Sequence, residues 1–248
     1  MKNFDSIYEK FEAACDRIDE GVQSESELKD ISDVLEALGK PKPGNSSKEA
    51  ALYAYACAHM ANGYYFLAEY EEENSDAGKK EAIAQHSLEN YFESVDNTDK
   101  KQAYSHYKKA LEFFIRSYEL FDSMSVSDDR DYLFADCCQM FAEFIWNIKL
   151  DADMKGFKDE DIEPYEAYKL YGESVDFYER LLAAGEYDTR DELIDVCFNA
   201  GGYHYEMGNI ELSKLFFARS KSLAEELEAE EPGVYDELLE LLEEYLQD

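Results

Sequence analysis

The sequence predicts an all-α protein of about ten helices, stacked so that most of them pack between two neighbours. Apolar residues recur at spacings of three and four along most of the 248 residues, which is the period of a helix. No alternating apolar and polar run of convincing length indicates a strand. Only 4 Pro and 12 Gly interrupt the pattern. Many helical stretches are apolar over more than half their circumference, as expected in a solenoid.

Short polar segments separate five predicted helices in the first half of the chain. The segments are LGKPKPGNSSK at 38–48, ENSDAG at 73–78 and VDNTDK at 95–100, all rich in turn-forming residues. Within the first of them, Ser46 is the expected N-cap of the helix that follows. The five predicted helices span 3–20, 26–38, 47–72, 77–95 and 99–123.

The second half has the same organisation. Asp128 is the expected N-cap of its first helix, the polar run from Asp151 to Pro164 ends that helix, and Pro232 stands where a first helical turn can begin. The helix at 128–149 shows the core pattern most clearly, through Leu133, Cys137, Met140, Phe141, Phe144, Ile145 and Ile148. The five predicted helices span 128–149, 162–184, 189–207, 210–229 and 233–246.

The segment IDVCFNAGGYHYEMGNIELSKLFFARSK at 194–221 resembles a tetratricopeptide repeat. Gly201 fits the small residue at the crossing of two helices, and Met207-Gly208-Asn209 fits the turn between them. The small, aromatic and small positions of the second helix are filled by Ser213, Phe217 and Ser220. Two further segments, 107–114 and 173–178, resemble the second helix of such a repeat.

The resemblance implies antiparallel helix pairs wound into a right-handed superhelix. It also implies a single helical-repeat domain over 1–248, with capping helices at 1–40 and at 230–248. The corresponding positions Ala110, Ser174 and Ser213 are not spaced by the ~34 residues typical of the family, so longer loops are expected between repeats. The Trp and Pro of the family pattern are missing at 194–225.

A second, weaker resemblance is to the 14-3-3 phosphopeptide-binding proteins. It rests on ANGYYFLAEY at 61–70 and FNAGGYHYEMGN at 198–209. Such proteins bind phosphate through Arg and Lys side chains. Here Phe66 follows Tyr64-Tyr65 where that family places an Arg, and the chain has six Arg in all. The likeness therefore implies shared helical packing without phosphate binding.

The net charge of −34, from 58 acidic and 24 basic residues, favours a basic partner. It disfavours direct binding to nucleic acid or to anionic membranes. The alternative is that the charge serves solubility alone. Five Cys without a CxxC pair indicate a reducing compartment, and neither a signal peptide nor an apolar run of ~18 residues is apparent. We therefore expect a cytoplasmic protein.

Catalytic and metal-binding motifs are not found in the sequence, so we expect no enzyme activity, no metal and no cofactor. There is no GxSxG, HExxH or Gly-rich phosphate loop. The loop 151–159 resembles the start of an EF-hand, but Lys155 and Ile162 replace two of the required ligands. The four His lie in helical, apolar patterns typical of packed residues, at 59, 86, 106 and 204.

Two surfaces are candidates for partner binding. The first is Tyr-rich: groove positions carried over from the repeat resemblance fall on Phe198, Gly202, Tyr205 and Glu206, and the pair Tyr64 and Tyr65 occupies a similar place earlier. The second is the C-terminal stretch 222–248, with eleven acidic residues and no basic one. Its candidate contacts are Glu240, Glu243 and Glu244.

These features predict a non-catalytic adaptor or scaffold that holds a basic protein. The alternative is an acidic mimic of nucleic acid that inhibits a nucleic-acid-binding protein. Rows of carboxylates at phosphate-like spacing favour the mimic, whereas an apolar groove lined by Tyr favours the adaptor. A capping helix is the competing interpretation of the acidic C-terminal stretch.

Overall fold

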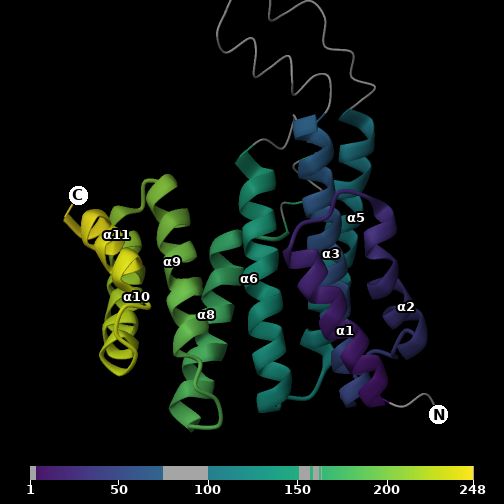
Figure 1. The fold of residues 1–248 in the computed structure, drawn as a ribbon, viewed down its shortest axis with the longest axis horizontal. Coiled ribbons are helices and arrows are strands. Elements are labelled where there is room, and N and C mark those ends of the chain that lie inside the picture. Colours follow the sequence, from purple (N-terminus) through teal and green to yellow (C-terminus); the bar gives the residue numbers. More distant parts are fainter. Residues whose placement is uncertain (1–3, 75–99, 151–156, 159–161, 163, 248) are drawn as a thin grey trace, which may run out of the picture. The chain divides into compact units, whose positions relative to one another are not determined.

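The computed structural model describes residues 4–74, 100–150, 157–158, 162 and 164–247 (Figure 1). Within these ranges it contains nine α-helices, one 3-10 helix and no strand, which confirms the all-α prediction. The predicted helix at 77–95, with His86, lies outside the described residues, as does most of the loop 151–159. The chain divides into two compact units: Met1–Ser125 with Asp151–Asp161, and Val126–Leu150 with Ile162–Asp248.

In the first unit, two long helices form the main pair. Ser117 Oγ on α5 donates to the carbonyl of Ala54 on α3 at 2.7 Å, and Gln102 Nε2 donates to Glu71 Oε1 at 2.8 Å, so the two helices run antiparallel. The helices α1 and α2 pack on α3 through a core that includes Phe11. The elements of this unit are α1 (Phe4–Asp19), η1 (Glu25–Leu28), α2 (Lys29–Leu38), α3 (Lys48–Asn74) and α5 (Lys100–Ser123).

The second unit consists of consecutive packed helices, in which α6 contacts α8, α8 contacts α9, α9 contacts α10, and α10 contacts α11 (Figure 1). In the α9–α10 pair, Ser213 Oγ donates to the carbonyl of Gly201 at 2.8 Å and Ser220 Oγ donates to that of Ile194 at 3.0 Å. These bonds fix the pair as antiparallel. The elements are α6 (Asp128–Leu150), α8 (Ala167–Ala184), α9 (Arg190–Glu206), α10 (Ile210–Glu230) and α11 (Asp236–Gln247).

Both predicted N-caps lie one residue from the residues that act as caps. Ser47 Oγ accepts the amide of Ala50 at 3.2 Å, while Ser46 Oγ accepts the amide of Ser125 at 2.8 Å and so ties two loops together. At α6, Ser127 Oγ accepts the amide of Arg130 at 3.3 Å, and Asp128 is the first helical residue. A hydroxyl and a carboxylate cap equally well, so sequence alone does not choose between adjacent candidates.

Two helices begin later than predicted. The helix predicted from residue 162 starts at Ala167, because Glu166 has an extended backbone with φ −123° and ψ 120°. The helix predicted from residue 233 starts at Asp236, because Gly233 has φ +95°, outside the helical region. The amide of Gly233 donates instead to the carboxylate of Glu228.

All five Cys are free and buried. Among the helices that the structure describes, none has the length of apolar sequence required to cross a bilayer. The single repeat domain over 1–248 stays a prediction.

Candidate partner-binding surfaces

The four predicted groove residues share one face of α9, and they contact two different helices. Phe198 and Tyr205 contact Tyr245 of α11, with ring centroids 6.3 and 5.6 Å apart. Tyr245 also stacks on Phe217 of α10 at 4.7 Å. The C-terminal helix therefore places one ring, that of Tyr245, against Phe198 and Tyr205.

Gly202 and Glu206 face α6 instead. A β-carbon at Gly202 would lie 3.5 Å from Cη2 of Trp146, and Trp146 Nε1 donates to Glu206 Oε2 at 3.1 Å. The indole also meets Tyr203 edge to face, with centroids 5.9 Å apart. A β-carbon at position 202 would therefore be in ordinary van der Waals contact with the indole.

One carboxylate lies beside this contact. Asn199 Nδ2 and Gln139 Nε2 both donate to Oε1 of Glu143, at 2.7 and 3.3 Å. No described residue donates to Glu143 Oε2. We call this surface the α6–α9 face, and its six residues are Gln139, Glu143, Trp146, Asn199, Gly202 and Glu206.

The electrostatic environment of the α6–α9 face is negative. Burial raises the pKa of Glu143, and the nearby carboxylates of Asp136 and Asp195 raise it further, against the two amide hydrogen bonds that lower it. Burial likewise raises the pKa of Asp195, with a further contribution from Asp191 and Glu192. Carboxylates that raise one another's pKa form a site in which a cation is favoured.

No Lys or Arg that the structure describes forms an ion pair with Glu143, Asp195 or Glu206. Two Arg residues of α6 and α9 are paired with other carboxylates. Arg130 binds Asp131 at 2.6 Å, and Arg190 binds Asp188 and Glu230, each at 2.6 Å. The negative charge of the α6–α9 face is therefore not neutralised by these two residues.

Tyr171 of α8 adds a buried polar group next to the face. The residue is 0% exposed and its hydroxyl has no hydrogen-bond partner among the described residues. Burial raises its pKa, followed by the charge of Glu143 and then the effect of Tyr203. Its ring lies 6.1 Å from that of Tyr203, the residue that also contacts Trp146.

Tyr64 and Tyr65 belong to the first unit and differ in their surroundings. Tyr64 is half-buried, stacked on His106 and Phe113 at 5.6 and 6.0 Å, with Lys109 Nζ 4.8 Å from its ring centroid. Tyr65 is buried, and its hydroxyl donates to Glu69 at 2.5 Å. Of the two rings, Tyr64 is the one with area left to offer a partner.

The three acidic candidates on α11 are exposed, but they are not equivalent. Glu243 accepts a bond from Lys221 at 2.9 Å, so part of its charge is compensated. Glu240 and Glu244 have no ion pair among the described residues. These two carboxylates are the ones available to attract a basic partner.

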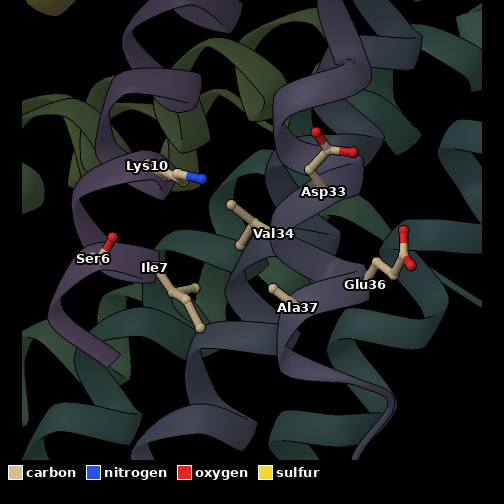
Figure 2. A pocket seen from close by; sticks show the side chains of 7 residues that line it. All are labelled: Ser6, Ile7, Lys10, Asp33, Val34, Glu36 and Ala37. Atoms are coloured by element: carbon tan, nitrogen blue, oxygen red, sulfur yellow. The ribbon is translucent and has the colours of Figure 1, made fainter. Parts of the chain in front are cut away.

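A shallow groove of about 510 Å³ lies between α1 and α2 (Figure 2). Its floor is apolar, but Ile7 and Val34 are only 9% and 1% exposed, so they offer little area to a ligand. Its lining carries charges of both signs, Lys10 on α1 and both Asp33 and Glu36 on α2. The groove is thus less selective for a cation than the α6–α9 face.

Among the residues that the structure describes, no group of three or more His, Cys, Asp or Glu side chains is arranged to hold a metal ion. His59 and His204 are buried and have ring nitrogens without partners. His106 is buried between two carboxylates, with Nδ1 2.8 Å from Glu71 and Nε2 3.1 Å from Glu25.

The sequence did not single out Glu143, Trp146 or Asn199. One signal was present: Gln139, Glu143 and Trp146 are spaced by four and three residues, so they share one side of a predicted helix, and Trp146 is the chain's one Trp. The spacing does not indicate that α9 is the helix that lies beside this side of α6.

Comparisons of the chain with protein-family models, with curated proteins and with solved structures return no match.

Proposed function

We propose that this protein is a non-catalytic adaptor or scaffold that holds a basic segment of another protein on the α6–α9 face. The proposal includes a right-handed superhelix of antiparallel helix pairs similar to tetratricopeptide repeats. The observation that supports it best is the pairing of an indole with unneutralised carboxylates on two helices that would line the groove of such a superhelix. Aromatic anchors and complementary charge are typical of protein-binding surfaces.

The packing of α9 on α10 supports the superhelix. A β-carbon at Gly201 would lie 2.6 Å from Cδ1 of Phe217, and the hydroxyls of Ser213 and Ser220 bond to the carbonyls of α9. Small residues at the crossing with one large ring between them are what the repeat resemblance requires. Five buried free thiols fit the proposed reducing, cytoplasmic setting.

Peptide binding tests this proposal directly, because Trp146 is the one Trp of the chain and its fluorescence reports on the α6–α9 face. A dye-labelled lysine-rich peptide and a glutamate-rich peptide of the same length are titrated with the protein. Anisotropy of the dye and emission of Trp146 are followed together. We expect the lysine-rich peptide alone to bind, to change the emission of Trp146, and to bind more weakly as salt rises, since the Debye length is ~8 Å at physiological ionic strength.

A neutral variant of α8 serves as the control. Asp176 is exposed, and Asp176→Asn removes one negative charge without changing the α6–α9 face, so it should leave the Trp146 response almost unchanged. Equal binding of both peptides, or binding that leaves the emission of Trp146 unchanged, would contradict the proposal.

A further inference from the structure

We infer that Glu143 is the anchor for one Lys or Arg side chain of the partner, received between Glu143 and Trp146. This inference rests on the proposed function and adds the contact that selects the partner. Oε1 of Glu143 accepts two amide donors from different helices, whereas no described residue donates to its Oε2.

The fixed oxygen keeps the carboxylate in place before a ligand arrives. Asn199 from α9 and Gln139 from α6 both donate to Oε1, at 2.7 and 3.3 Å. A side chain held in this way loses little rotamer freedom when it binds, so less of the interaction energy is spent on ordering it. Oε2 is the atom left to accept bonds from a cation.

The hydroxyl of Tyr171 is an independent sign of an unfilled polar position. The residue is 0% exposed and its hydroxyl has no partner among the described residues, although buried polar groups are nearly always hydrogen-bonded. Glu143 is the charge that acts on it most strongly. An ammonium or guanidinium group has several N–H donors and no acceptor, so it can donate to the carboxylate oxygen of Glu143.

Trp146 provides the aromatic side of the contact. Its orientation is set by the bond from Nε1 to Glu206 at 3.1 Å and by the edge-to-face contact with Tyr203. An indole face attracts Lys and Arg head groups, and the methylene stem of either side chain packs well on it. An anionic side chain would instead be repelled by Asp136 and Asp195, the carboxylates that already raise the pKa of Glu143.

A double-mutant cycle between protein and peptide tests the anchor. Each Lys of the lysine-rich peptide is replaced in turn by norleucine, which keeps the stem and removes the charge. With the wild-type protein we expect one position to stand out, where the replacement weakens binding about tenfold, as expected for a hydrogen bond to a charged group. With Glu143→Gln, the same replacement should change the affinity by less than about twofold.

Two controls separate anchoring from folding. Glu143→Gln retains the Oε1 acceptor for Asn199 and Gln139, so the variant should melt at or above the wild-type temperature while losing the preference for Lys. Asp176→Asn should retain the full norleucine effect. If Glu143→Gln lowers the melting temperature and weakens every peptide equally, the role of Glu143 is structural and the inference is wrong.

The outcomes also distinguish the anchor from the function on which it rests. If lysine-rich peptides bind and the norleucine effect is equally large in Glu143→Gln, then the partner is basic but Glu143 is not its anchor. If neither the lysine-rich peptide nor any norleucine variant binds the wild-type protein, the proposed function fails and the anchor with it.

The pH dependence of binding gives a second readout. The charged and titratable groups around Glu143 are Asp136 on α6, Asp195 on α9 and Tyr171 on α8. Because the pKa of Glu143 is raised in the free protein, a bound cation should drive the release of its proton. Affinity for the lysine-rich peptide should therefore rise with pH through that pKa in the wild type and less steeply in Glu143→Gln. Identical slopes would contradict the anchor.

Discussion

A β-carbon on Gly201 of α9 would lie 2.6 Å from both Cδ1 and Cε1 of Phe217 on α10. The ring cannot move away easily, because Phe217 is 1% exposed and stacks on Tyr245 at 4.7 Å. The close approach of α9 and α10 thus depends on the absence of a side chain at one position. The crossing is also linked to α11, because Tyr245 of that helix stacks on the ring of Phe217.

Gly201→Ala should therefore destabilise the protein by about 1–3 kcal/mol, the usual cost of overpacking a core. Gly172→Ala is the matched control, because Gly172 is also within a helix but its β-carbon would meet nothing within 4 Å. That change should stabilise the protein by about 0.5–1 kcal/mol through helix propensity. Urea unfolding of both variants measures the difference. Equal stabilities of the two variants would show that the crossing of α9 and α10 accommodates a β-carbon at position 201, contrary to the structure.

His59 should make the protein less stable in mild acid. Burial lowers its pKa from 6.5 to about 4, and neither ring nitrogen has a hydrogen-bond partner among the described residues. Between these two values the unfolded chain takes up a proton that the folded chain does not, so the free energy of unfolding falls as pH falls from 6.5 toward 4. The expected loss is on the order of 3 kcal/mol.

Replacing His59 by Phe isolates this effect. The imidazole contacts the rings of Tyr55 and Phe11, with centroids 4.6 and 5.4 Å away, so an aromatic replacement suits the site. The stability of His59→Phe relative to the wild type should increase from pH 7 to pH 4 and stay constant above pH 7. A difference independent of pH would mean that the imidazole has the same pKa in the folded and the unfolded chain.

The thiols should be unreactive until the chain unfolds. Burial raises the pKa of Cys57 and of Cys197 to about 12, and only the thiolate reacts readily. A maleimide reagent at pH 8 should label all five Cys in guanidinium chloride but neither of these two in the native protein, as measured by mass spectrometry of the digested chain. Rapid native labelling of Cys57 or Cys197 would contradict their burial.

The α11 carboxylates should affect the rate of association more than the lifetime of a complex. Reversing Glu240 and Glu244 to Lys removes long-range attraction for a basic peptide without breaking an ion pair, whereas Glu243→Lys would also disrupt the bond from Lys221. Stopped-flow mixing with the lysine-rich peptide should show slower association and nearly unchanged dissociation. Unchanged association would show that Glu240 and Glu244 do not attract the peptide.

Local sequence signals predicted the α9–α10 pair well, because its determinants are a Gly, a tight turn and two Ser within one short segment. They did not predict the α6–α9 face, because Glu143 and Asn199 are separated along the chain by the whole of α8. Which helix lies beside α6 is decided by tertiary packing and not by periodicity. Tertiary packing also decides the surroundings of Tyr65. Its ring lies near that of Tyr107 on another helix as well as that of Phe66, so the run of Tyr residues does not indicate that Tyr65 is buried.

Glu143 should cost the folded protein stability at neutral pH. Burial raises its pKa above the ordinary value of 4.5, and Asp136 and Asp195 add to the shift. A carboxyl whose pKa is higher in the fold than in the unfolded chain binds its proton more tightly in the fold, so the free energy of unfolding falls as pH rises through that range. Glu143→Gln should therefore be more stable than the wild type at pH 7, and its advantage should shrink as pH falls from the raised pKa of Glu143 toward 4.5. Thermal melts of both proteins across this pH range measure the change.

Asp176→Asn, at an exposed position, is the control and should show no such trend with pH. If Glu143→Gln is instead less stable at pH 7, interactions within the protein, such as the amide bonds from Asn199 and Gln139, already stabilise the ionised carboxylate, and the site would not need a cation from outside.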